Sequence, residues 1–161
     1  MPDAVVEKIQ PCLLDRLTDE KPESQKEGRN ERIISVRRYR EGVMRDLIWL
    51  LNGKSHTADE EELKEFPLVA RSVLNFGTRD LCGLISANMN LGDLEHEIAE
   101  AIRCFEPRID PRTLEVKAVA GTKRDSNGLS IEIRGELWAH PIPEQLYLRS
   151  EIDLDTGEYS A

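Results

Sequence analysis

The sequence has few aromatic residues, no excess of positive charge and no long apolar run. Aromatic residues make up 5% of its 161 residues, so the predicted core is aliphatic. Its 22 Lys and Arg residues against 31 Asp and Glu residues give a net charge of −9. This balance argues against nucleic acid and against anionic membrane surfaces as partners, because both require a basic face. No stretch approaches the roughly 18 apolar residues of a membrane span, and the start MPDAVVEKIQ lacks the features of a signal peptide. We therefore expect a cytoplasmic protein without direct membrane insertion.

Metal-binding and catalytic signatures are also missing. Cys12, Cys82 and Cys104 lie far apart and form neither a CxxC pair nor a disulfide framework. The stretch HEIAE, which starts at His96, begins like a zinc-protease helix but lacks the second histidine four residues later. There is no GxSxG motif and no glycine-rich phosphate loop. We expect no catalytic residue, no metal site and no cofactor.

Two apolar patterns with helical spacing precede three patterns of period two. Residues 35–51, and the stretch 91–109 up to the break at Pro107, repeat apolar residues every three or four positions, which is typical of amphipathic helices. Residues 114–118, 129–137 and 145–155 alternate apolar and polar residues, as strands do. The predicted fold class is α+β, with N-terminal helices packed on a C-terminal antiparallel three-stranded meander. On residues 35–51 we expect the charge pairs Arg37–Glu41 and Glu41–Arg45.

The N-terminal part is predicted to differ from the rest. Residues 1–30 contain one short helix, CLLDRL, with Leu13, Leu14 and Leu17 available for burial. Residues 18–30 then form a charged linker without large apolar residues, which predicts a mobile segment. Residues 31–161 are predicted to form a single α+β domain. The sequence does not decide whether the N-terminal helix packs on its own domain or on a neighbour.

The sequence Glu106-Pro107-Arg108 follows the helix at residues 91–105. Glu106 lies at the carboxyl end of a helix, where the dipole disfavours a carboxylate. A rigid proline between the acid and the base fixes the directions of both side chains. Two readings remain open: a local ion pair, or a guanidinium presented to a partner's carboxylate or carbonyl groups.

The last predicted strand, residues 145–155, has little chain after it to cover its edge. An uncovered edge is a template for the strand of another chain. The candidate positions for such pairing are Leu148, Arg149, Ser150, Glu151, Ile152 and Asp153. Alternatively, the charges of Arg149, Glu151 and Asp153 protect this edge from pairing.

Four stretches together resemble a known family. RRYREGVMRDLIWLLN, ARSVLNFG, EIAEAIRCFEPRI and the closing EIDLDTGE are similar to TssE, a baseplate component of the bacterial type VI secretion system. The same family includes the wedge protein of contractile phage tails once labelled lysozyme-like. The resemblance covers residues from Cys12 to Gly157, and Phe76 stands where a tyrosine is common.

The resemblance implies a structural role in assembly. It implies a fold similar to the interlocking domain of the sheath protein, and a part in templating polymerisation of the contractile sheath. Partners implied in this way are the wedge subunits TssF, TssG and TssK and the sheath proteins TssB and TssC. Glu106, Pro107 and Arg108 match the family's Glu-Pro-Arg motif, which is held to contact the wedge core.

Three other functions are alternatives to this one. The first is a phage-tail-derived baseplate wedge protein, which the sequence does not separate from a secretion component. The second is a peptidoglycan hydrolase with Glu106 as its acid, but a guanidinium beside Glu106 favours the ionised carboxylate, the opposite of what a general acid needs. The third is an adaptor in another cytoplasmic system.

Overall fold

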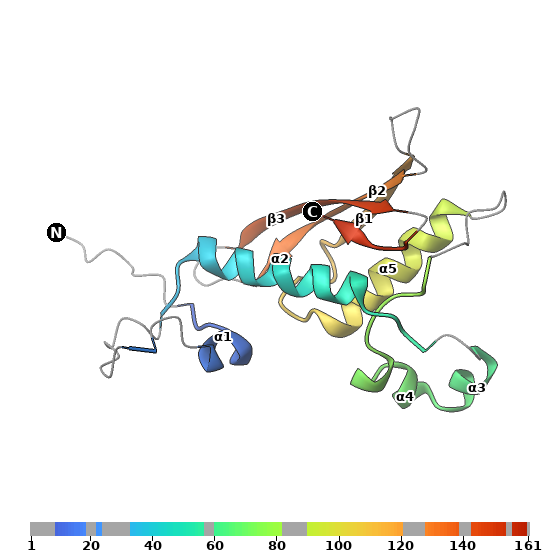
Figure 1. Cartoon of the computed structure of the whole chain (residues 1–161), viewed down its shortest axis with the longest axis horizontal. Coiled ribbons are helices and arrows are strands. Elements are labelled where there is room, and N and C mark those ends of the chain that lie inside the picture. Colours follow the sequence, from blue (N-terminus) through green and yellow to red (C-terminus); the bar gives the residue numbers. More distant parts are fainter. Residues whose placement is uncertain are drawn as a thin grey trace.

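The computed structural model describes residues 9–18, 22–23, 33–56, 60–81, 90–120, 128–138, 143–153 and 156–160. Helices come first along the chain and strands last, which confirms the predicted α+β class (Figure 1). The helices are α1 (Leu13–Leu17), α2 (Val36–Asn52), α3 (Glu60–Glu65), α4 (Pro67–Ala70), the 3-10 helix η2 (Val73–Asn75) and α5 (Leu91–Phe105). The strands are β1 (Glu115–Ala120), β2 (Gly128–Leu137), β3 (Glu144–Asp153) and β4 (Tyr159–Ser160).

The sheet has four strands in the order β1-β2-β3-β4, and all neighbours are antiparallel. The prediction of a three-stranded meander was therefore incomplete. The three predicted strands are present, and β4 adds a fourth through the pairs Glu151–Ser160 and Ile152–Tyr159. A two-residue strand is too short to show an alternating pattern, so β4 could not be predicted from periodicity.

Both long predicted helices are confirmed, and their ends have local causes. The Ser35 side chain caps α2 by accepting a hydrogen bond from the backbone N–H of Arg38. The Asn90 side chain caps α5 in the same way through the N–H of Gly92. Helix α5 ends at Phe105, because Pro107 disfavours helical geometry at the residue before it.

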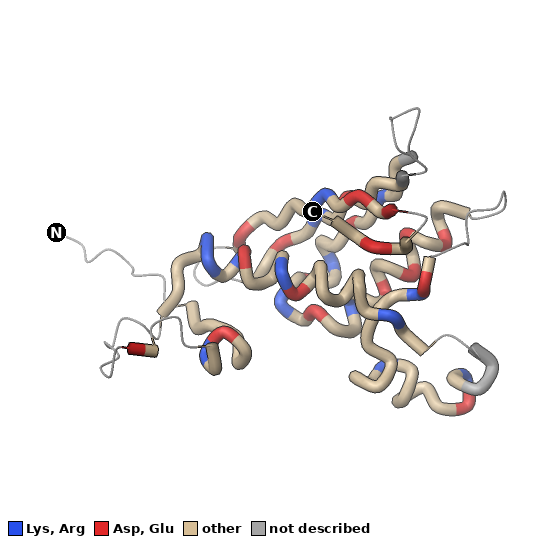
Figure 2. The backbone as a smooth tube through the Cα atoms, viewed as in Figure 1, with Lys and Arg blue, Asp and Glu red and all other residues tan. Residues whose placement is uncertain are grey.

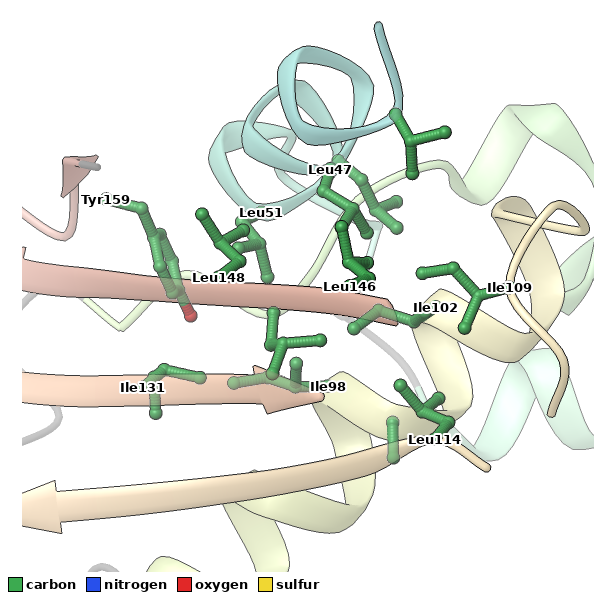
Figure 3. Close-up of a cluster of buried hydrophobic side chains, with 14 of the residues drawn as sticks. Leu47, Leu51, Ile98, Ile102, Ile109, Leu114, Ile131, Leu146, Leu148 and Tyr159 are labelled. Carbon is green, nitrogen blue, oxygen red and sulfur yellow. The ribbon is translucent and has the colours of Figure 1, made fainter. Parts of the chain in front are cut away.

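The core lies between the sheet and the two long helices. Every second residue of β3 is buried, as expected for a strand with one covered face. Figure 3 shows side chains of α2, α5 and the strands meeting in one mainly aliphatic cluster, which also contains Tyr159. Each fully buried Leu or Ile contributes about 1.5–3 kcal/mol relative to an exposed one. The buried members from the helices include Val43, Leu47, Leu50, Leu51, Leu94, Ile98 and Ile102, and those from the strands include Ile131, Ile133, Leu146, Leu148 and Ile152.

The N-terminal helix α1 exists but does not bury its leucines. Leu13 is 68% exposed and Leu17 is 73% exposed, and α1 has no buried residue. Although the sequence makes these leucines available for burial, they are not buried within this chain, and docking of α1 on a neighbour stays a prediction. The contact with the core comes earlier, at Ile9, which forms an antiparallel bridge with Ile34. Most of the predicted linker, residues 18–30, lies outside the described residues.

Charge is divided between the two long helices. Figure 2 shows mostly Lys and Arg near the start of α2 and mostly Asp and Glu along α5. The predicted pair Arg37–Glu41 forms at 2.9 Å. Within the described parts of the chain, no helix is long and apolar enough to cross a membrane.

Candidate functional site

Glu106 is a buried carboxylate directly after the last residue of α5. Only 4% of this residue is exposed. Its backbone N–H donates to the carbonyl of Ile102 at 2.8 Å, which keeps the chain in the last helical turn. Pro107 then turns the chain and is itself exposed. The acid of the motif therefore points into the protein, whereas the proline faces outward.

Arg108 folds back onto Glu106. Its backbone N–H donates to Glu106 Oε1 at 3.1 Å, and its Nε donates to the same oxygen at 2.6 Å. Its Nη2 also pairs with Glu106 Oε2. Of the two readings left open by the sequence, the local ion pair is the one that the structure contains. Both carboxylate oxygens of Glu106 therefore accept hydrogen bonds from Arg108 within the protein.

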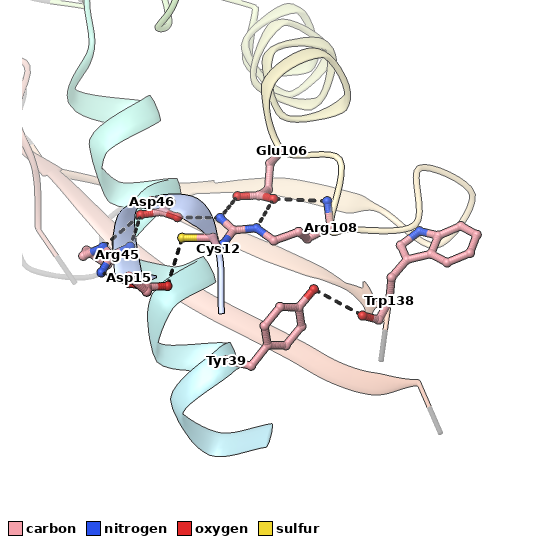
Figure 4. A network of polar contacts seen from close by, with 8 residues as sticks. All are labelled: Cys12, Asp15, Tyr39, Arg45, Asp46, Glu106, Arg108 and Trp138. Carbon is pink, nitrogen blue, oxygen red and sulfur yellow. Dashed lines mark hydrogen bonds and ion pairs between the residues drawn. The ribbon is translucent and has the colours of Figure 1, made fainter. Parts of the chain in front are cut away.

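Asp46 of α2 is a third member of this site, and sequence reasoning missed it. Arg108 Nη2 donates to Asp46 Oδ2 at 2.6 Å. Arg45 pairs with Asp46 at 2.7 Å and with Asp15 of α1, also at 2.7 Å. Figure 4 shows these contacts as one continuous series across three parts of the chain. We call Asp15, Arg45, Asp46, Arg108 and Glu106 the ion chain.

Arg45 pairs with residues other than the predicted partner Glu41. Arg45 turns toward Asp15 and Asp46, while Glu41 accepts from Arg37. The spacing rule for helices detects neighbours on the same helix surface. It cannot detect Asp15 or Arg108, because both lie far away in sequence. The sequence signal for this site is that Arg45 and Asp46 are adjacent on a helix. Adjacent opposite charges are too common on helices to identify a site.

The contacts within the ion chain shift the pKa values of Arg108 and Asp15. Burial disfavours the charged guanidinium of Arg108, but hydrogen bonds and charge from Glu106 and Asp46 outweigh it and raise the pKa of Arg108. Burial also disfavours the charged form of Asp15, but hydrogen bonds from Cys12 and Arg45 outweigh it and lower the pKa of Asp15. Both residues are therefore held in their charged forms.

Backbone contacts hold the Glu-Pro-Arg turn against the end of β2. The carbonyl of Arg108 accepts from the N–H of Trp138 at 2.8 Å. The hydroxyl of Tyr39 donates to the carbonyl of Trp138 at 3.2 Å (Figure 4). One residue later, Ile109 forms a bridge with Leu137. The turn is thus tied to both α2 and the sheet.

A second acid-proline-arginine sequence, Asp110-Pro111-Arg112, follows at once. Arg112 pairs with Asp110 at 2.7 Å, but its side chain is 81% exposed, against 19% for Arg108. Arg112 also lowers the pKa of Asp110 through hydrogen bonds. The same residue pattern therefore occurs once within the protein body and once at its surface. This difference provides an internal control for the first turn.

The predicted strand edge is only partly covered. In β3, Leu148, Ser150 and Ile152 are buried, whereas Arg149, Glu151 and Asp153 are exposed. Three of the six candidate positions therefore face the core, and three face outward from the sheet.

The hydrogen-bonding edge of β3 faces β4. The N–H of Asp153 donates to the carbonyl of Glu158 at 3.0 Å, on the β4 side. Because backbone direction alternates along a strand, the backbone groups of Tyr147 and Arg149 face the same side. Among the described strands, β4 pairs with β3 only at Glu151 and Ile152. This corrects the expectation that little chain covers the edge: one end of it is covered.

Comparison with known proteins places the site in a family. The family described as baseplate wedge protein gp25 matches residues 37–142, well over half of the chain. The chain belongs to this family. It is the family that contains TssE, so the resemblance noted in the sequence is confirmed at that level. A search of curated proteins found no match.

Membership of the gp25 family makes this chain a baseplate wedge-like structural protein. Its family indicates assembly with other baseplate proteins. The matched residues include α2, α5 and the whole Glu-Pro-Arg turn, whereas α1, β3 and β4 lie outside them. Among the described residues, no three His, Cys, Asp or Glu side chains gather as metal ligands.

Proposed function

We propose that the chain is the TssE-type baseplate subunit of a bacterial type VI secretion system. In this role it works in the cytoplasm, joins the wedge with TssF, TssG and TssK, and templates the sheath built from TssB and TssC. The observation that carries the proposal is the Glu-Pro-Arg turn, held rigidly after α5 inside the region matched by the baseplate family. A phage-tail-derived wedge protein is the alternative within the same family.

Within the motif, the three residues have different roles in this proposal. Pro107 is the exposed member and makes the direct contact with the wedge. Glu106 and Arg108 hold the turn in shape, because their side chains bind each other and Asp46. Glu106, Pro107 and Arg108 thus bind the partner together in this proposal. Pro107 makes the contact, and the ion pair of Glu106 and Arg108 supports it.

Co-purification tests the wedge contact. Tagged wild-type chain, co-expressed with TssF, TssG and TssK, is expected to recover the wedge complex. The variant Pro107→Ser is expected to recover much less, with an unchanged circular dichroism spectrum. The matched control is Pro111→Ser, because Pro111 is also exposed and also stands between an acid and an arginine. Equal recovery with Pro107→Ser and wild type would remove the turn from the interface.

The sheath contact is proposed for the edge of β3 that β4 leaves unpaired, at Tyr147 and Arg149. An added strand would bond to backbone groups there and continue the sheet, as in strand addition generally. A fold similar to the sheath interlocking domain is part of this proposal. The strand is anchored in the core by its buried residues Leu148, Ser150 and Ile152. The end of β3 that contains Glu151 and Asp153 already lies beside β4.

A proline substitution in β3 tests this edge. Tyr147→Pro removes one N–H from the outer edge and also the ring that lies 5.4 Å from the guanidinium carbon of Arg134, and prolines are tolerated at sheet edges. We expect this variant to stay folded and to lose binding to assembled TssB–TssC sheath. The control Tyr147→Ala removes the same ring but keeps the N–H, so binding should persist. Sheath binding by folded Tyr147→Pro would exclude this edge as the docking strand.

A further inference from the structure

Strand β1 is the outermost strand on its side of the sheet, among the strands that the structure describes. Its sequence, EVKAVA, is mostly apolar, and Val119 is 43% exposed. The backbone N–H of Ala118 points away from β2, because it donates to a side chain of α5. The backbone groups of Val116 point the same way, since direction alternates along a strand. Apolar edge strands of this kind pair with other chains unless a side chain or another element blocks them.

Glu95 of α5 occupies this edge. Its Oε1 accepts from the N–H of Ala118 at 2.8 Å, the distance at which the carbonyl oxygen of an added strand would lie. The helix holds Glu95 there, because Leu94 and Ile98 are buried and fix the rotation of α5 against β1. Glu95 itself is only partly exposed. An added strand would therefore have to displace a carboxylate from a charge-assisted hydrogen bond, which is stronger than a neutral one.

The opposite edge of the sheet differs from this one. Among the described strands, β4 pairs with β3 only at Glu151 and Ile152, and the outward backbone groups of Tyr147 and Arg149 lie beyond that pairing. Since β1 and β3 are both antiparallel to β2, they run in the same direction. The β3 edge of a second copy in the same orientation would thus lie parallel to β1 and continue the sheet, with both cores on one side.

We propose that Glu95 blocks the β1 edge, so that the β3 edge of a second copy of this chain does not pair with it. Every copy has both edges, so an open β1 edge would join copies head to tail. Such contacts form open filaments unless their rotation closes a ring. With β1 blocked, the sheet accepts a further strand on its β3 side only. The blocked occupant is a second copy of the chain, so this role of Glu95 is independent of the proposed function.

Sedimentation velocity of the purified full-length chain, over a range of concentrations, tests the block. Glu95→Ala removes the acceptor, and α5 should persist because alanine has the highest helix propensity. We expect the mass of wild type to stay constant, whereas Glu95→Ala forms species of more than twice that mass that grow with concentration. Glu95→Gln is the matched control, since it removes the charge but keeps an acceptor oxygen, and its mass should stay constant. Asp93→Ala, at an exposed acid of the same helix, controls for the change in net charge.

Two further measurements locate the contact. In dilute Glu95→Ala, the Ala118 amide should exchange with solvent at least about tenfold faster than in wild type, because it has lost a hydrogen bond to a charged group. The double variant Glu95→Ala/Tyr147→Pro lacks one N–H of the β3 edge, and its mass should return to that of wild type. Glu95→Ala/Tyr147→Ala keeps that N–H and should still form oligomers.

The outcomes that would overturn the proposal are distinct. A constant mass for Glu95→Ala at every concentration would show that its β1 edge does not pair. Oligomers formed equally by wild type, Glu95→Gln or Asp93→Ala would show that loss of the acceptor is not their cause. A dimer of Glu95→Ala that persists with Tyr147→Pro would exclude the β3 edge as the occupant.

Discussion

Replacing Arg108 with alanine should destabilise the protein before any partner is present. The substitution leaves the carboxylate of Glu106 buried without its guanidinium, and removes one of the two partners of Asp46. Breaking a buried pair by deleting one member costs about 3–5 kcal/mol. Here Asp46 keeps Arg45, and the backbone N–H of residue 108 still reaches Glu106. We therefore expect a loss of about 2–3 kcal/mol in the free energy of unfolding.

Urea unfolding followed by tryptophan fluorescence measures this loss. Trp49 reports on the site directly, because its ring lies 5.1 Å from the guanidinium carbon of Arg45. A loss of this size is a large part of the roughly 5–15 kcal/mol that holds a domain together, yet it leaves the variant folded in water. The midpoint should fall while the slope against urea stays constant.

The neighbouring turn supplies the control for this experiment. Arg112→Ala removes an arginine in the same acid-proline-arginine context, but its pair with Asp110 is at the surface. Exposed pairs often contribute nothing measurable, so its midpoint should match wild type. In addition, Glu106→Gln/Arg108→Ala should be more stable than Arg108→Ala, because the orphaned charge is gone. An Arg108→Ala midpoint equal to that of Arg112→Ala would refute the reasoning.

Three further predictions concern other parts of the fold. Burial raises the pKa of Tyr159 to about 12, above the ordinary 10.0, so its contribution is complete below pH 10 and is lost as the pH rises toward 12. Stability measured from pH 9 to 12 should fall less in Tyr159→Phe than in wild type. Gly77 has φ +125°, and a Cβ atom there would lie 2.3 Å from the Gly53 carbonyl oxygen. Gly77→Ala should therefore lower the free energy of unfolding by more than about 1 kcal/mol. An unchanged urea midpoint would contradict this. Ser35→Ala removes the cap of α2 and should cost about 1 kcal/mol, whereas Ser35→Asp should retain most of the stability.

The parts of the fold that the sequence predicted are those with a repeating pattern. Helices α2 and α5 follow from apolar residues three and four positions apart, and β2 and β3 follow from strict alternation. Such patterns are local, and burial against a common core reinforces them. Strand β4 has only two residues and therefore no period, so its pairing with β3 could be found only from the three-dimensional arrangement.

Local pattern failed where a residue's partner is distant in sequence. The sequence did not decide where α1 packs, and the contact of Asp15 with Arg45, 30 residues away, could not be read from local spacing. Asp46 lies 62 residues from Arg108 and joins it only in the folded protein. The motif at residues 106–108 was found from the sequence, while its supporting residues on α1 and α2 were not.

Sheath assembly in living cells tests the central claim most directly. In a bacterium that carries this chain's gene, a fluorescent TssB fusion would be followed before and after deletion of the gene. The account predicts that extended sheaths disappear on deletion, return with the wild-type chain, and remain absent with the folded variant Pro107→Ser. Sheaths that form at the normal frequency without the chain would contradict its role as a baseplate subunit of this machine.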